Sequence, residues 1–379
     1  MAGADPAPEH PRVALVVATT EGGVGAHVRS LTAGLAERGL TVSVVGPEQT
    51  DQRFGFSDAG ARFLSWGVSD RPRPGDLGEM LRLRRLLRGV DVVHAHGVRA
   101  GALSALALTG RRRPALIVTL HNAPVRGGRV GAVYALLARI VAFRADLVCG
   151  VSPDLVEGAR RRARAVALAS IAAPPLAPSQ RDRAAVRGEL EASERPLILV
   201  VGRLAEQKGF VTLLEASRVW GRRVVPPLVV VAGEGPMRPE LERRIEAGGL
   251  PVRLLGRRDD VSDLLEAADV LVVPSLWEGQ SLVLQEAVRS GRPIVATEVG
   301  GTPGVVGDAA LLVPAGDAQA LARAAAAIID DAEVADRLAR AARKRAETLP
   351  TEDEAVESVL RWYHRLIALR AAHGPNASD

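Results

Sequence analysis

The strongest constraint on the fold is a regular alternation of short apolar runs with segments of helical periodicity along the whole chain. Short β-branched runs that alternate with helices are typical of parallel strands, because each parallel strand needs a crossover connection to the next. The sequence therefore predicts an α/β fold in which helices cover both faces of parallel sheets. The strands are expected at residues 12–19, 40–45, 61–64, 90–94, 116–120, 145–151, 197–201, 228–232, 252–255, 270–273 and 293–297.

One stretch interrupts this alternation. Residues 163–195 are rich in Ala and Pro, and we interpret them as a connection between two domains. The predicted N-terminal domain covers residues 12–185 and the predicted C-terminal domain covers residues 190–350. Residues 1–11 are expected to be a disordered tail, and residues 351–379 to form a C-terminal helix and a tail.

Composition excludes several classes of protein. The 379 residues include one cysteine, Cys149, so a disulfide framework is excluded and a reducing, cytoplasmic location is expected. The formal net charge of +5 favours an anionic partner. The chain has only five Phe, four Trp and two Tyr, which argues against a base-stacking surface and hence against a nucleic-acid partner. No apolar run approaches the roughly 20 residues that span a bilayer.

Two helical patterns place arginines beside an apolar stripe, at residues 79–88 and 129–144. Helices of this kind can lie on an anionic membrane surface, which would give a peripheral position on the inner face of the cell membrane. The alternative is that the stripe faces the protein core and the arginines face solvent. The sequence leaves both interpretations open.

Residues 269–301 carry the clearest functional pattern. The run 270–273 predicts a buried strand that ends at Pro274, and a helix is predicted to begin near Ser281 and to end before Gly291. The start of a helix offers unpaired backbone N–H groups and the positive end of the helix dipole to an anion. We therefore expect a phosphate group to bind at Gly279, Gln280, Ser281 and Leu282.

Two glutamates flank this predicted phosphate site. Glu278 precedes the helix, and Glu286 lies about five residues inside it, roughly 7–8 Å along the axis at 1.5 Å per residue. Carboxylates accept hydrogen bonds from hydroxyl groups, so the layout suits a nucleotide diphosphate sugar, with the sugar at one end and the ribose diol at the other. The alternative is that Glu278 caps the helix and Glu286 is an ordinary exposed residue.

Two cations follow the predicted strand at residues 197–201. Arg203 and Lys208, in the segment GRLAEQKGF, can bind one diphosphate, Arg as a planar fork and Lys as a point charge. No Asp-x-Asp pair occurs in the chain, so no metal site is predicted and these two cations are expected to stabilise the leaving diphosphate. The alternative is a solvated surface pair.

These segments, with EGQSLVLQEA and VATEVGG, resemble the family-four retaining glycosyltransferases over nearly the whole chain. The resemblance implies a GT-B architecture: two Rossmann-like, doubly wound domains face each other across a cleft, and the C-terminal helix crosses back to the first domain. It implies that Glu278 contacts the transferred sugar, that Glu286 holds the ribose, and that configuration is retained. It also implies a nucleotide diphosphate sugar as donor substrate, with no other cofactor.

The resemblance assigns residues in the N-terminal half as well. The turn EGGVG places Gly22 and Gly23 where the family has a Gly-Gly turn near the donor phosphate and the acceptor. His121, in TLHN, matches a family histidine close to the transferred sugar, and His94 and His96 in DVVHAHG are weaker candidates. An oxidoreductase dinucleotide site is disfavoured because the turn lacks the third glycine of that fingerprint.

The predicted function is therefore transfer of a hexose, such as mannose, glucose or N-acetylglucosamine, to an unidentified acceptor that is lipid-linked or part of the cell envelope. Two alternatives stay open. A sugar-nucleotide epimerase or hydrolase of the same shape would act without an acceptor. A non-catalytic partner protein would bind the sugar nucleotide only, although the intact set of four charged residues argues against a decayed site.

Overall fold

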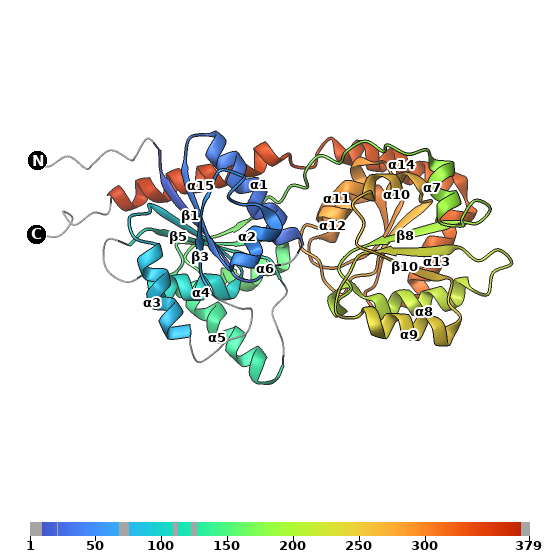
Figure 1. Ribbon diagram of the computed structural model, residues 1–379, viewed down its shortest axis with the longest axis horizontal. Coiled ribbons are helices and arrows are strands. Elements are labelled where there is room, and N and C mark those ends of the chain that lie inside the picture. The colour runs from blue at the N-terminus through green and yellow to red at the C-terminus, as the bar shows by residue number, and fades with distance from the viewer. Residues whose placement is uncertain (1–9, 21, 68–75, 109–112, 123–126, 373–379) are drawn as a thin grey trace, which may run out of the picture. The chain divides into compact units, whose positions relative to one another are not determined.

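The computed structural model describes residues 10–20, 22–67, 76–108, 113–122 and 127–372 (Figure 1). The chain divides into two compact units, of which unit 2 is Ala173–Leu349 and unit 1 is the rest. The boundary thus lies earlier than the predicted interval between residues 185 and 190. The predicted disordered tail falls largely outside the described residues.

Unit 1 is built on a parallel sheet with the strand order β3-β2-β1-β4-β5-β6-β7. Figure 1 shows α3, α4 and α5 along one side of this sheet and α1 and α15 along the other. The strands are β1 (Arg12–Val17), β2 (Thr41–Gly46), β3 (Arg62–Ser65), β4 (Val92–His96), β5 (Ala115–Leu120), β6 (Leu147–Gly150) and β7 (Val166–Leu168). The helices are α1 (Gly23–Glu37), α2 (Glu48–Phe54), α3 (Asp76–Leu86), α4 (Val98–Ala107), α5 (Gly128–Arg144), α6 (Pro153–Arg160) and α15 (Glu352–Ala372).

Unit 2 repeats this plan with the order β10-β9-β8-β11-β12-β13, and its neighbouring strands also pair in parallel. The strands are β8 (Leu197–Val201), β9 (Leu228–Ala232), β10 (Val252–Gly256), β11 (Val270–Val273), β12 (Ile294–Thr297) and β13 (Ala310–Val313). The helices are α7 (Arg183–Glu189), α8 (Phe210–Trp220), α9 (Arg238–Gly248), α10 (Val261–Ala267), α11 (Leu282–Arg289), α12 (Thr302–Val306), α13 (Ala318–Asp330) and α14 (Ala332–Ala346), with short 3-10 turns at Glu206–Lys208 and Gly307–Ala309.

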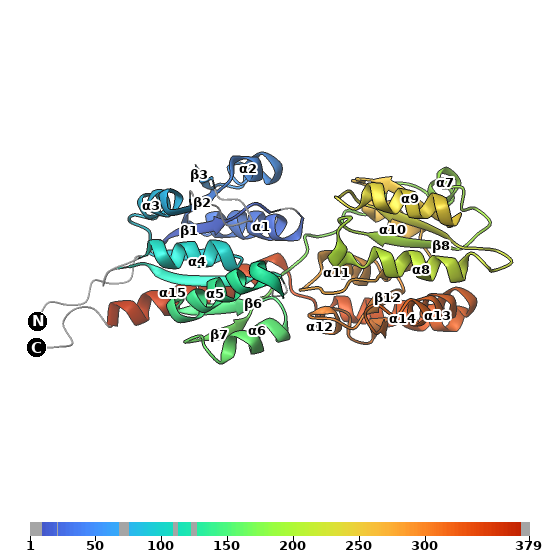
Figure 2. The same cartoon turned by 90° about the horizontal axis from the view of Figure 1, so that it is seen from below.

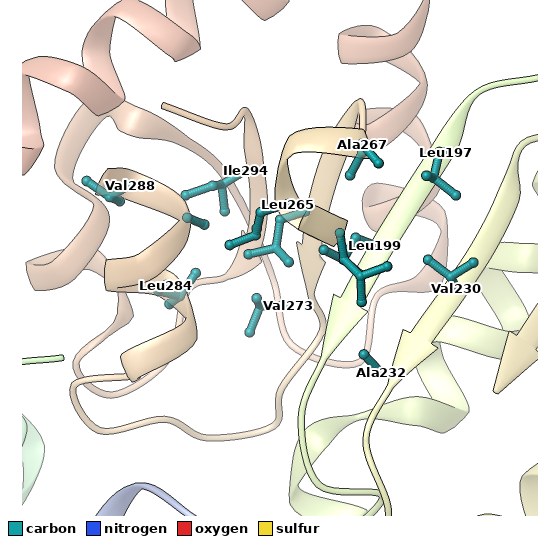
Figure 3. Close-up of a cluster of buried hydrophobic side chains, with 14 of the residues drawn as sticks. Leu197, Leu199, Val230, Ala232, Leu265, Ala267, Val273, Leu284, Val288 and Ile294 are labelled. Carbon is teal, nitrogen blue, oxygen red and sulfur yellow. The ribbon is translucent and has the colours of Figure 1, made fainter. Parts of the chain in front are cut away.

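Alternate residues of the unit 2 strands enter two separate cores, one on each face of the sheet. Leu197 and Leu199 of β8 pack in a cluster with Leu284 of α11, whereas Ile198 and Val200 pack on the opposite face. Figure 3 shows part of the first cluster, which contains Leu284 and Val288 of α11 together with residues of the strands. Because both faces are buried, these strands are continuous apolar runs, and they are the segments that the sequence predicts best.

The segment interpreted as a connection between domains contains regular structure. β7 adds an edge strand to unit 1, and α7 belongs to unit 2. The carboxylate of Asp182 caps α7 and accepts hydrogen bonds from the backbone N–H groups of Ala184 and Ala185 at 2.9 and 3.2 Å. A strand of three residues and a helix of seven are too short for periodicity to reveal them.

The C-terminal helix α15 packs within unit 1, although unit 2 precedes it in the chain. A Cβ added at Gly34 of α1 would lie 2.5 Å from Val356 of α15, so the glycine allows the two helices to approach closely. Tyr363 of α15 is fully buried, and its hydroxyl lies 2.8 Å from Nδ1 of His94 in β4. Figure 2 shows α3, α4 and α5 side by side in the same unit.

Candidate active site

The predicted donor-site residues of unit 2 lie on loops that follow parallel strands. Arg203 and Lys208 follow β8, and Glu278 lies between β11 and α11. The carboxyl ends of parallel strands meet at one edge of a sheet, and ligands of open α/β sheets bind at that edge. The backbone N–H of Leu276 donates to the carbonyl of Gln207 at 2.8 Å, so the two loops are joined directly.

Two glycines allow these loops to touch through their backbones. Gly209 has φ +68°, and a Cβ there would lie 1.9 Å from the carbonyl oxygen of Pro274. Gly300, in the loop after β12, has φ +51°, and a Cβ there would lie 2.0 Å from the carbonyl oxygen of Glu278. Any larger residue would push the loops apart. The position of Glu278 is therefore fixed from both neighbouring loops.

The Glu278 carboxylate is buried and bound by two donors. Lys208 Nζ lies 2.6 Å from Glu278 Oε1, and Ser275 Oγ donates to the same oxygen at 2.6 Å. Ser275 is itself held, because Thr297 Oγ1 donates to its carbonyl at 2.5 Å. Ser275 is not among the residues predicted for the site, although its place directly after the strand-ending Pro274 is a local signal. The finding replaces the helix-cap alternative for Glu278 with a carboxylate held by a lysine and a serine.

Helix α11 begins where the sequence predicts. Ser281 is the N-cap residue, and its side chain accepts from the backbone N–H of Leu284 at 3.5 Å. The first turn contains no acidic residue that would compete for the helix N-terminus. The residues beside this cap, Gly279, Gln280 and Leu282, are partly buried. The predicted phosphate-binding segment therefore lies at the N-terminus of α11.

Glu286 is the fifth residue of α11 and is half-buried. Burial raises the pKa of its carboxyl to about 7, against the opposing effect of the Arg289 cation. A carboxyl group with this pKa is partly protonated near neutral pH, unlike an ordinary exposed glutamate. This burial does not fit the alternative of an exposed helix residue.

Arg203 and Lys208 differ in their surroundings. Arg203 is exposed directly after β8, whereas Lys208 is partly buried against Glu278. The aliphatic stem of Lys208 passes the backbone of Gly202, since its Cδ and Cε lie 3.8 Å from the position of a Cβ added there. The joint binding of one diphosphate by the two cations stays a prediction.

In unit 1, Gly22 is the N-cap of α1, with φ +82°, and Gly23 is the first helical residue. Both are exposed at the carboxyl end of β1, as the glycine-turn interpretation requires. His121 follows β5 directly and is partly exposed.

Four histidines of unit 1 form one cluster. His27 comes from α1, His94 and His96 from β4, and His121 follows β5. The ring centroids of His27 lie 5.8 Å from His96 and 5.9 Å from His121, and those of His94 and His96 are 4.4 Å apart. The strand was predicted two residues too early, at 90–94, so His94 lies inside β4 and His96 is its last residue. The side chains of His94 and His96 are both buried.

Burial keeps these imidazoles neutral. It lowers the pKa of His27 to about 4 and that of His94 to about 3, and it also lowers the pKa values of His96 and His121. Within the described ranges, no group of three or more His, Cys, Asp or Glu side chains is arranged to hold a metal ion. The helices of the same residues include none long and apolar enough to cross a membrane.

The fold is that of the GT-B proteins. The solved structure of the Anabaena protein HepE in complex with UDP and glucose matches with a TM-score of 0.80 over 94% of this chain and 100% of that chain. The two sequences are 19% identical, so the likeness is one of fold. The predicted α/β class with two Rossmann-like domains is confirmed.

Two family descriptions match the chain. "Glycosyl transferases group 1" matches residues 182–345, and "Glycosyl transferase 4-like domain" matches residues 22–174. The first range contains both glutamates and both cations of the predicted donor site, and the second contains His121. The chain therefore belongs to the group 1, family-four glycosyltransferases, as the resemblance predicted.

Two curated relatives show the range of this family. The chain is 32% identical over 163 residues to an alpha-D-kanosaminyltransferase of Streptomyces kanamyceticus, covering 41% of this chain and 42% of that protein. It is 24% identical over 360 residues to the O-antigen chain mannosyltransferase C of Escherichia coli, covering 92% of this chain and 95% of that protein. The alignment thus spans less than half of the first relative.

Proposed function

We propose that the protein is a glycosyltransferase that moves a hexose from a nucleotide diphosphate sugar to an acceptor. The observation that carries the proposal is the buried Glu278 carboxylate, bound by Lys208 and Ser275 beside the N-terminus of α11. Lys208 and Ser275 both donate to Oε1, so the carboxylate retains lone pairs that can accept hydrogen bonds from hydroxyl groups. This is the chemistry needed to hold a sugar.

The diphosphate is proposed to bind next to this carboxylate. An ammonium group has three N–H donors, so Lys208 can keep its bond to Glu278 and still donate to a phosphate oxygen. Arg203 adds a second cation, and the entrance to α11 adds backbone N–H groups. Glu286, one turn further along α11, is proposed to accept hydrogen bonds from the ribose diol. His121 of unit 1 is proposed to hydrogen-bond a hydroxyl group of the transferred sugar.

The proposed reaction retains configuration and needs no metal ion. The bond between the anomeric carbon and the diphosphate oxygen breaks, and its electron pair stays on the diphosphate, whose charge Arg203 and Lys208 stabilise. The acceptor hydroxyl attacks the same face, and its proton passes to the leaving phosphate oxygen. Glu278 is not proposed as a nucleophile; its carboxylate, held at Oε1 by Lys208 and Ser275, is proposed to bind the sugar through hydrogen bonds.

The acceptor is proposed to be lipid-linked or part of a cell envelope, with the protein bound peripherally to the inner face of an anionic membrane. The structure distinguishes the two basic helices. In α3, Leu83 is buried, as is Leu87 just beyond the helix, so the stripe faces the core, although Leu81 is 50% exposed. In α5, Val130, Leu136 and Phe143 are 60%, 58% and 63% exposed.

Helix α5 also contains Arg129, Arg139 and Arg144, and residues 128–144 include no acidic residue. A helix that has exposed apolar side chains and only basic charged residues complements a negatively charged lipid surface. Sedimentation with vesicles of phosphatidylglycerol and phosphatidylcholine tests this contact. The double variant Leu136→Glu/Phe143→Glu should lose binding, whereas Leu369→Glu, an exposed leucine of α15, should not. Binding unchanged in the double variant, or a dimer held through α5 instead, would refute it.

The transferase activity is tested by incubating the protein with UDP-, GDP- and ADP-hexoses and a lipid-linked saccharide extract. Release of nucleotide that depends on the extract supports transfer. Release at the same rate without any acceptor would indicate a hydrolase, and tight binding without turnover would indicate a binding protein.

A further inference from the structure

His121 does not stand alone at the end of β5, because its ring is joined to a second histidine. His96 Nδ1 lies 3.1 Å from His121 Nε2, and the ring centroids are 5.3 Å apart. His96 is 4% exposed, while His121 is partly exposed. The hydrogen bond therefore directs Nε2 of His121 toward the interior and leaves Nδ1 as the ring nitrogen that can meet a ligand.

The ring of His96 stacks against His94, which is itself held by hydrogen bonds. His94 packs against it with an interplanar angle of 28°. Both nitrogens of His94 are bound, Nδ1 to Tyr363 Oη at 2.8 Å and Nε2 to Thr119 Oγ1 at 2.7 Å. His94 thus links β4 to β5 and to α15, and it provides a rigid surface for His96.

Because both rings are neutral, only one of the two facing nitrogens, His96 Nδ1 or His121 Nε2, carries the proton of this hydrogen bond. Either His96 Nδ1–H donates to His121 Nε2, or His121 Nε2–H donates to His96 Nδ1. His96 Nε2 is buried and has no hydrogen-bond partner among the described residues. The second arrangement would place a proton on that nitrogen and bury an N–H group without an acceptor, which proteins largely avoid. If His96 Nδ1–H is the donor instead, His96 Nε2 carries only a lone pair.

We propose that His96 is a positioning residue that holds His121 in the tautomer protonated at Nδ1. His121 then presents a hydrogen-bond donor, and not a base, to a substrate oxygen. The substrate contact rests on the proposed function, but the tautomer is a property of the protein itself. His96 would act only through His121, because it lies behind that ring.

Nitrogen-15 NMR of the wild-type protein, labelled at histidine, tests the tautomer directly. Long-range proton–nitrogen correlations distinguish protonated from bare ring nitrogens, and the signals lost in His121→Gln identify the residue. We expect His121 to be protonated at Nδ1 and bare at Nε2. Protonation at Nε2, or an equal mixture of both tautomers, would overturn the proposal.

Variants of His96 separate positioning from packing. His96→Gln retains an amide N–H donor and should keep His121 protonated at Nδ1, whereas His96→Leu removes the donor and should give a mixture. His364→Leu, at an exposed histidine of α15, is the matched control and should leave the His121 signals unchanged. In His96→Leu we expect kcat roughly tenfold lower, the effect of one misplaced hydrogen bond, with nucleotide affinity unchanged. An unchanged His121 tautomer in His96→Leu would refute the positioning role.

The two proposals fail separately. If the tautomer is as stated but no sugar nucleotide binds, the inference about His96 stands and the proposed function is wrong. If transfer is observed but His121 is protonated at Nε2, the function stands and the inference is wrong.

Discussion

Lys208 Nζ lies 2.6 Å from Glu278 Oε1, so the cation predicted to bind a diphosphate and the carboxylate predicted to bind a sugar form a single ion pair. Lysine is otherwise rare in this protein, since the only other one is Lys344. An ammonium group suits this position because it bonds the carboxylate with one N–H and retains two others. The Lys208–Glu278 pair therefore joins the proposed diphosphate site to the proposed sugar site.

Lys208→Ala should weaken nucleotide diphosphate binding by roughly 10- to 100-fold, because it removes a charge-assisted hydrogen bond and leaves Glu278 without its cation. Isothermal calorimetry measures the change. Lys344→Ala, at an exposed position on α14, is the control and should leave affinity unchanged. Equal affinities for the two variants would rule out a phosphate contact at Lys208.

Glu278→Gln and Glu286→Gln should have different effects. Glu278→Gln should leave the affinity for the free nucleotide within about threefold and lower kcat/KM roughly 100-fold, because only sugar contacts in the transition state are lost. Glu286→Gln should weaken binding of the free nucleotide itself by roughly tenfold. The assignment of sugar to one glutamate and ribose to the other fails if both variants change nucleotide affinity alike.

Donor binding should weaken in acid. Burial raises the pKa of Glu286 to about 7, and the ribose hydroxyls require its ionised form as acceptor. Acidification protonates the carboxyl, so the dissociation constant should rise as the pH falls through that pKa and level off at roughly the tenfold loss expected for Glu286→Gln. In Glu286→Gln the dissociation constant of the donor should not change with pH over this range. A flat profile in the wild-type protein between roughly pH 5.5 and 7.5 would contradict the ribose contact.

Unit 1 should lose stability in acid before unit 2. The pKa values of His27 and His94 are lowered from 6.5 to about 4 and about 3, so the unfolded chain binds protons that the folded unit does not. Stability is fully present above the unfolded value and falls by about 1.4 kcal/mol per pH unit for each histidine as the pH drops toward the folded values. Hydrogen exchange at pH 7 and pH 5, resolved by peptide, should show faster opening in unit 1 alone, because all seven histidines lie there. Equal protection of β4 at both pH values would disprove it.

Gly209→Ala should destabilise unit 2 by about 3 kcal/mol or more. It combines an unfavourable φ of +68° with a Cβ placed 1.9 Å from the carbonyl oxygen of Pro274. Gly249→Ala is the matched control: its φ is +54°, but no described atom lies within 4 Å of the added Cβ, so only the backbone strain of about 1 kcal/mol applies. Urea unfolding compares the two variants, and similar losses would show that the loop contact is unimportant.

The sequence predicted the fold well where strands are buried on both faces. β8, β9 and β11 begin and end at the predicted residues because their apolar runs are uninterrupted. The start of α11 was also predictable, since Pro274 and Ser281 are local signals. The short elements β7 and α7 were missed because neither is long enough to show a period.

The partners within the site were not predictable. Lys208 and Glu278 are 70 residues apart, and their contact depends on β8 pairing with β11. The histidine cluster likewise depends on β4 lying between β1 and β5. The spacing of His94 and His96 does place both on one face of a strand, but which residues face them is decided by the strand order.

The most direct test of the donor site is calorimetric titration of the wild-type protein with UDP, GDP and ADP, each with and without EDTA. The account predicts that one of the three nucleotide diphosphates binds at least tenfold more tightly than the other two, and that EDTA has no effect. If none of the three binds, or if binding disappears with EDTA, the site formed by Arg203, Lys208, Glu278 and Glu286 is not a metal-independent site for a nucleotide diphosphate.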